Sequence, residues 1–91
     1  MHFVLSYDYV PDVLQRRTPF RAGHLALAGE YHTAGRLLLA GAFEPPSDGA
    51  LFVFKVDSAA EVETFVRRDP YVQNGVVTGH RIHPWNVVVG G

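Results

Sequence analysis

His24 is the residue of this sequence that is best suited to proton transfer near neutral pH. It lies in the segment 18–35, in which apolar side chains recur with the spacing of an amphipathic helix. At about 100° per residue, one narrow sector of this helix contains Phe20, His24, Leu27 and Tyr31. Because an unpaired imidazole in a protein core costs about 1–3 kcal/mol, His24 needs a hydrogen-bond partner from another part of the chain.

Asp69 is the partner that the sequence pattern favours. It follows Val62 by seven residues and Phe65 by four, so it continues the apolar stripe of a second predicted helix. If both helices cover the same face of a sheet, His24 and Asp69 point into one space between the helices and the sheet. A carboxylate beside an imidazole fixes the tautomer and stabilises the protonated ring, which suits a general acid or base.

Both residues also have an ordinary structural interpretation. A buried histidine is more often satisfied by a backbone carbonyl or a tyrosine than used in catalysis, and His24 taken alone favours that interpretation. Asp69 stands before Pro70, and an aspartate before a proline at a helix start is a common N-cap. One carboxylate oxygen can cap the helix while the other meets His24, so the two roles of Asp69 are compatible.

The remaining candidates are side chains that we expect to line a substrate pocket beside His24. They are Ser6, Tyr7, Phe20, Arg21, Leu39 and Tyr71. Arg21 comes one turn before His24, and it can either bind a carboxylate or extend over the surface with its charge in water. Tyr71 has more the character of a packing aromatic than of a proton donor.

The five histidines raise the question of a metal site. His24 and His32 are separated by about 12 Å along a helix axis, which is too far for one ion. His80 and His83 point to opposite faces of a regular strand. The sequence also contains no cysteine and no glycine spacing of a P-loop or a dinucleotide-binding fold. We therefore expect neither a metal site nor a cofactor.

The elements that must position these residues occur in the order strand, helix, strand, strand, helix, strand. The predicted strands span 3–9, 37–43, 50–56 and 76–89, the main helices span 18–34 and 58–68, and short helical turns span 11–16 and 70–74. Thr18 is the expected N-cap of the first main helix, Gly35 follows its C-terminus, and Ser58 with Glu61 has the pattern of a capping box. This order predicts the ferredoxin-like α+β fold, an antiparallel sheet with both helices on one face.

Two of the predicted strands are apolar on both faces. Residues 37–39 and 51–54 show no alternation of apolar and polar side chains, although a sheet covered on one side normally does. No third layer is available in so short a chain, so a second copy is the simplest cover. We expect a homodimer joined through the sheet faces, with Trp85 as an anchor of the interface. Pro84 requires the last strand to be kinked or to lie at an edge.

Composition limits the class of protein. The 91 residues predict one domain spanning 1–91. A formal net charge of −1 does not favour nucleic acid as a partner. The absence of cysteine fits a cytoplasmic protein, and the apolar stretches are shorter than the roughly 18 residues of a membrane helix. The N-terminus has no basic region, so we expect no signal peptide.

Five segments recur together in a known family. They are Arg21–Leu25, Gly35–Gly41, Asp48–Leu51, Asp69–Tyr71 and Pro84–Val87. With these segments in this order, essentially the whole chain resembles the YciI-like (YCII-related) proteins. The resemblance implies a ferredoxin-like protomer in a dimeric α/β barrel, and an active-site histidine and aspartate at His24 and Asp69. Some similar proteins break down substituted aromatic compounds, and the wider superfamily includes muconolactone isomerases and small monooxygenases.

These observations favour a small dimeric enzyme of lyase or isomerase type that acts on an aromatic or lactone acid. In this hypothesis His24 moves a proton while Asp69 orients the imidazole and stabilises its charge. Two alternatives stay open. A non-catalytic ligand-binding or accessory module would use the same pocket without proton transfer, and a purely structural dimerisation domain would have no cavity beside His24.

Overall fold

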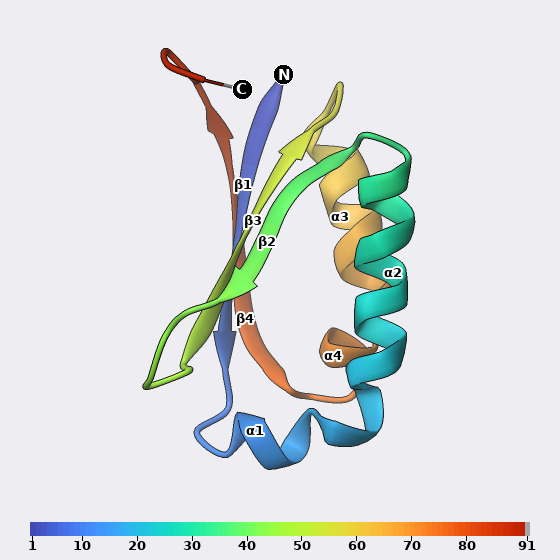
Figure 1. Ribbon diagram of the computed structural model, residues 1–91, viewed down its shortest axis with the longest axis vertical. Helices are drawn as coiled ribbons and strands as arrows, with labels where there is room; N and C mark the ends of the chain where they lie inside the picture. Colours follow the sequence, from blue (N-terminus) through green and yellow to red (C-terminus); the bar gives the residue numbers. More distant parts are fainter. Residues whose placement is uncertain (91) are drawn as a thin grey trace.

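The computed structural model describes residues 1–90, which form a four-stranded antiparallel sheet with helices packed on one face (Figure 1). The strands lie in the order β2-β3-β1-β4. The elements are β1 (His2–Tyr9), α1 (Val13–Arg16), a 3-10 turn (Thr18–Phe20), α2 (Arg21–Thr33), β2 (Leu37–Ala42), β3 (Gly49–Lys55), α3 (Ala59–Arg68), α4 (Pro70–Gln73) and β4 (Val77–Trp85). The predicted ferredoxin-like α+β fold is therefore confirmed.

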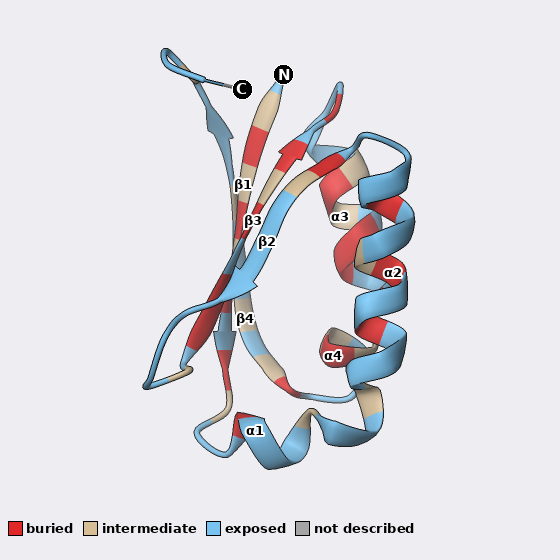
Figure 2. Cartoon of the chain, viewed as in Figure 1, coloured by how far each residue is buried: buried red, intermediate tan, exposed pale blue. Residues whose placement is uncertain are grey.

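The core lies between the sheet and the helices α2 and α3, where the buried residues gather (Figure 2). Strand β1 alternates as expected for a strand with one buried face, with Phe3, Leu5, Tyr7 and Tyr9 all turned toward the helices. The aromatic rings of β3 pack edge-on against the helices. Phe54, for example, lies 5.2 Å from the ring of Phe65 on α3.

Strand β2 departs from regular alternation through a shift of register. Leu37 pairs with Phe54 and Leu39 pairs with Val53, so β2 advances by two residues where β3 advances by one, as in a β-bulge. Because side chains alternate between faces, one added residue moves every later side chain to the opposite face. Leu39 consequently lies on the face away from the helices, and Ala40 takes the inward position opposite Phe52.

Two predicted helix starts differ from the structure. The hydroxyl of Thr18 donates to the backbone oxygen of Leu14 at 3.1 Å, so Thr18 does not cap α2, which begins three residues later at Arg21. Ser58 makes no side-chain cap either, although Glu61 accepts a hydrogen bond from the backbone N–H of Asp57 at 2.9 Å. In both cases a competing local hydrogen bond replaces the one that the pattern predicts.

The C-terminal strand and the end of α2 agree better with the sequence patterns. Strand β4 lies at an edge of the sheet, as Pro84 requires, but it ends at Trp85 rather than at residue 89. After α2, Gly35 has φ +76°, the N–H of Gly35 bonds to the oxygen of His32, and the N–H of Arg36 bonds to that of Tyr31. This is the glycine-terminated helix end that the sequence predicts.

No helix within residues 1–90 is long and apolar enough to cross a membrane.

Replacing Gly35 with alanine should lower the free energy of unfolding by about 1 kcal/mol, because a Cβ atom disfavours the left-handed conformation. Urea denaturation measures the change. The control is Gly29→Ala, inside α2, where an added Cβ meets nothing within 4 Å. That variant should be more stable than the parent by up to about 1 kcal/mol. A Gly35→Ala protein as stable as the parent would contradict this account of the helix end.

Candidate functional site

Asp69 is a fully buried carboxylate at the junction of α3 and α4. Helix α3 ends at Arg68, and Pro70 prevents the same helix from continuing because it has no N–H and restricts the preceding residue. Asp69 therefore has an extended backbone, with φ −74° and ψ 120°. Its Oδ1 accepts a hydrogen bond from the backbone N–H of Tyr71 at 3.0 Å, so the predicted N-cap is present.

The same carboxylate binds two side chains from other elements. The hydroxyl of Tyr7 on β1 donates to Oδ2 at 2.7 Å. Nδ1 of His24 on α2 lies 2.9 Å from Oδ1 and 3.0 Å from Oδ2. An ionised carboxylate only accepts hydrogen bonds, so Nδ1 carries the proton in this arrangement. The structure thus brings together the two residues that the helical patterns single out.

Two aromatic rings pack against the imidazole of His24. The ring of Tyr71 stacks on it at a centroid distance of 3.9 Å and an interplanar angle of 4°. Phe52 approaches edge-on from the sheet at 6.1 Å. His24 is only 7% exposed, yet Nε2 has no hydrogen-bond partner among residues 1–90. This nitrogen is left free to accept or donate a proton.

Two tyrosines near Asp69 stay protonated over a wide pH range. Burial, with the charge of Asp69 as a second cause, raises the pKa of Tyr7 well above its usual value. Burial also raises the pKa of Tyr9 to about 12, and Tyr71 and Asp69 act in the same direction. The positive charges of Arg17 and Arg21 oppose that rise. Both hydroxyls can therefore serve as hydrogen-bond donors near neutral pH.

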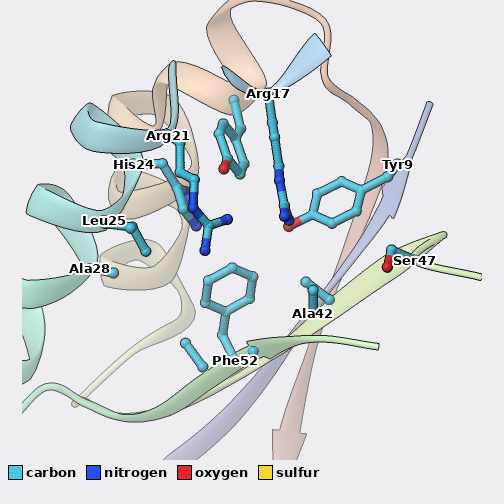
Figure 3. Close-up of a pocket in the computed structure, with 13 residues that line it drawn as sticks. Tyr9, Arg17, Arg21, His24, Leu25, Ala28, Ala42, Ser47 and Phe52 are labelled. Carbon is cyan, nitrogen blue, oxygen red and sulfur yellow. The ribbon is translucent and has the colours of Figure 1, made fainter. Parts of the chain in front are cut away.

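A pocket of about 360 Å³ lies beside His24, between α2 and the sheet (Figure 3). Its polar lining consists of Tyr9, Arg17, Arg21, His24, Ser47 and Tyr71. The floor is formed by Phe52 and by small residues of β2 and β3, among them Ala40 and Ala42. The register shift in β2 makes this room, because regular alternation from Leu37 would turn Leu39 inward instead.

The other predicted binding residues divide into three groups. Arg21 and Tyr71 line the pocket. Tyr7 lies behind it as a donor to Asp69, and Phe20 packs against the core outside the lining. Ser6 and Leu39 lie on the opposite face of the sheet, so the structure does not bring them to the pocket. Ser6 lies on that face because the inward-facing residues of β1 are the odd-numbered ones. Leu39 lies there because of the register shift in β2.

Arg17 and Tyr9 are pocket residues that sequence reasoning missed. Arg17 follows α1 as its C-cap residue, within the segment 10–18, which carries no motif, and Tyr9 is the last residue of β1. The spacing of four residues between Arg17 and Arg21 is the one signal that links Arg17 to the site. Within residues 1–90, no three histidine, aspartate or glutamate side chains cluster closely enough to hold a metal ion.

Comparison with known proteins defines the family. A sequence model of the YCII-related domain matches residues 1–86. The chain belongs to the YCII-related domain family. An uncharacterized protein from Haemophilus influenzae is 27% identical to it, over 97% of this chain and 99% of that protein. The resemblance found in the sequence is therefore confirmed.

Solved structures of similar proteins show the same fold. A 5-chloro-2-hydroxyhydroquinone dehydrochlorinase from Burkholderia phenoliruptrix, in complex with 2,5-dihydroxybenzoquinone, superposes with a TM-score of 0.80 at 22% identity, over 94% of each chain. The protein Atu4242 from Agrobacterium tumefaciens gives a TM-score of 0.56 at 10% identity, over 90% of this chain and 88% of that one. At these identities the likeness concerns the fold alone.

Replacing Tyr7 with phenylalanine should lower the free energy of unfolding by about 1–3 kcal/mol, because the buried Asp69 carboxylate loses a donor but keeps its charge. Chemical denaturation at neutral pH measures the change. The matched control is Tyr9→Phe on the same face of β1, because the Tyr9 hydroxyl makes no hydrogen bond within the part of the chain that the structure describes. Equal losses of unfolding free energy in the two variants would show that the hydrogen bond from Tyr7 to Asp69 does not stabilise the fold.

Proposed function

We propose that this protein is a small-molecule enzyme of lyase or isomerase type, in which His24 transfers a proton on an aromatic or lactone acid. The observation that carries the proposal is the asymmetry of the imidazole. Nδ1 is bonded to the fully buried Asp69, while Nε2 is free on a side chain that lines an open pocket. A general base needs this combination of a fixed tautomer and a free nitrogen within reach of the substrate.

The surroundings of His24 support a role in both directions of proton transfer. When Nε2 takes a proton, the ring becomes cationic and the Asp69 carboxylate at 2.9 Å stabilises that charge. The stacked Tyr71 ring prevents the imidazole from tilting, so Nε2 stays aimed in one direction. The same nitrogen can then return the proton to a different atom of the substrate, as an isomerisation requires, or release it to solvent after an elimination.

The chemistry of the dehydrochlorinase with the same fold is compatible with this site. Removal of hydrogen chloride takes a proton and a chloride ion from the substrate, and the carbon–chlorine electron pair leaves with the chloride. Such an elimination balances with proton transfer alone and needs no external electron acceptor. A pocket of about 360 Å³ with an aromatic floor has room for a single substituted ring.

Replacing His24 with glutamine should reduce turnover by about 100-fold or more, because an amide cannot take up a proton near neutral pH. Chloride release from chlorinated hydroxyhydroquinones and isomer formation from lactone acids, followed by NMR, are the measurements. His80→Gln is the control, since His80 is an exposed histidine of β4 outside the pocket. An unfolding curve for each variant establishes that the comparison is between folded proteins.

Two results would contradict the proposal. One is turnover by the His24→Gln variant at the rate of the parent. The other is a parent protein that binds these compounds, with the thermal stabilisation that saturating ligand produces, yet converts none of them. The second result would favour a ligand-binding or accessory module that uses the same pocket.

We also propose that the protein is a homodimer joined through the sheet face that carries no helix. Three large apolar side chains on this face are exposed in the single chain, namely Leu39 (70%), Leu51 (40%) and Trp85 (48%). They belong to β2, β3 and β4, so the apolar surface extends across the sheet. A monomer rarely exposes such a surface, whereas a second copy related by a two-fold axis would cover it.

Replacing Leu39 with aspartate should convert the dimer to a monomer, because each interface would gain two buried charges without partners. Sedimentation equilibrium measures the mass of the particle. Leu14→Asp is the control, since Leu14 is 60% exposed on α1, away from the sheet. A parent protein that sediments as a monomer would overturn the proposal, and so would a Leu39→Asp protein that remains dimeric.

We further propose that residues 1–91 act as one domain in the cytoplasm. The support is the cysteine-free composition, which suits a reducing compartment in which disulfides do not persist. The match of the YCII-related domain to residues 1–86 supports a single functional unit.

A further inference from the structure

Arg17 and Arg21 place two positive charges in the pocket without an acidic partner. The ion pairs within residues 1–90 join Arg68 to Glu30, His24 to Asp69 and His80 to Glu63, and neither pocket arginine takes part in any of them. The pocket lining contains no aspartate or glutamate. Figure 3 shows both guanidinium groups reaching into the space in front of His24. Two guanidinium groups in one pocket whose lining has no carboxylate give that pocket a positive charge, which an anionic ligand would complement.

The carboxylate that contacts His24 does not neutralise these arginines. Asp69 is fully buried behind His24, and its two oxygens already accept hydrogen bonds from Tyr7, His24 and the backbone N–H of Tyr71. Tyr9 is also held neutral by its raised pKa, although both arginines act on it. No side chain that lines the pocket neutralises the two arginines, so their positive charge is available to bind an anionic ligand.

A second, independent observation concerns the hydroxyl of Tyr71. Tyr71 lines the same pocket and is 1% exposed, yet its hydroxyl has no hydrogen-bond partner among the residues that the structure describes. A buried donor without an acceptor is unfavourable in the free protein, and a ligand oxygen in the pocket would complete the bond. Its ring stacks on His24, so the acceptor that it awaits lies close to the proton-transfer site.

We propose that the pocket binds an anionic oxygen-rich ring compound, whose ionised oxygens are held by Arg17 and Arg21 and which also accepts a hydrogen bond from the Tyr71 hydroxyl. This inference deepens the proposed function and rests on it, because it names the charge state of the substrate of the same site. Ionised enols, phenols and carboxylates share the required chemistry. A guanidinium group binds two oxygens at once, so the arginines would fix the orientation of the ring as well as its affinity.

The test is binding, measured by calorimetry, of two quinones that differ in charge. 2,5-Dihydroxybenzoquinone is a vinylogous acid that is ionised at neutral pH, and 2,5-dimethoxybenzoquinone is its neutral counterpart. The parent protein should bind the dihydroxy compound at least about tenfold more tightly, with an affinity that falls as salt is added. Arg17→Gln and Arg21→Gln should each lose about tenfold in affinity for the dihydroxy compound and little for the dimethoxy one.

The control for net charge is Arg16→Gln, which removes the same charge from an exposed arginine of α1 that does not line the pocket. Its affinity for both quinones should equal that of the parent protein. Equal affinities of the parent for the two quinones, or equal effects of Arg16→Gln and Arg17→Gln, would overturn the proposal.

Tyr71→Phe separates a ligand-binding hydroxyl from a structural one. Loss of an unpaired buried hydroxyl should leave the urea midpoint of the free protein unchanged or higher, while affinity for the dihydroxy compound falls. A lower midpoint with unchanged affinity would overturn the role of this hydroxyl. None of these measurements needs turnover, so the binding result stands or fails separately from the catalytic role of His24.

Discussion

The buried carboxylate of Asp69 is the group on which the rest of this structure depends. Removing a charge from water is costly unless hydrogen bonds replace the lost hydration, and here the donors come from three separate elements. Tyr7 is on β1, His24 is on α2, and the backbone N–H of Tyr71 is at the start of α4. The charge is therefore satisfied only when both helices are docked on the sheet in this arrangement. Fold and candidate site share one set of hydrogen bonds.

The double use of Asp69 also explains why its structural and functional roles do not compete. A carboxylate has about four lone-pair positions, and the helix cap occupies one of them. The remaining positions accept from Tyr7 and His24, so the local requirement of the Asp69–Pro70 turn brings an anion to the imidazole. The stacked ring of Tyr71 comes from the same turn. Three features that a general base needs, namely tautomer, charge partner and orientation, thus follow from one break between two helices.

The sequence predicts those parts of the site that depend on regular periodicity and on element order. His24 and Asp69 each continue an apolar helical stripe, and the ferredoxin-like topology puts both stripes on one face of the sheet, so their contact is predictable. Leu39 shows the limit, whereas the regular alternation of β1 is enough to place Ser6 on the face opposite to Tyr7. Which face of a strand a residue occupies depends on parity, and the single extra residue in β2 reverses that parity without any sign in the run of leucines at 37–39.

Irregular segments account for the other differences. Thr18 has the sequence of an N-cap, but its hydroxyl bonds backward to Leu14 because a 3-10 turn separates it from α2. The position of Arg17 depends on this same turn, which has no repeating geometry to extrapolate. From the sequence alone, an arginine in such a segment cannot be distinguished from an ordinary surface charge, because the direction of its guanidinium group depends on the irregular backbone. The polar half of the pocket was therefore less accessible to sequence reasoning than the imidazole and its partner.

The shape of the pocket follows from the irregularity of β2 rather than from its composition. Regular alternation would place Leu39 opposite Phe52 and fill the space in front of His24. The register shift turns Leu39 to the uncovered face and brings Ala40 and Ala42 inward, so one backbone event both opens the cavity and adds apolar surface to the opposite side of the sheet. The space for a ligand and the surface proposed for the second copy are thus coupled through the same strand. A substitution that restored regular pairing in β2 would act on both at once, because the faces exchange their side chains together.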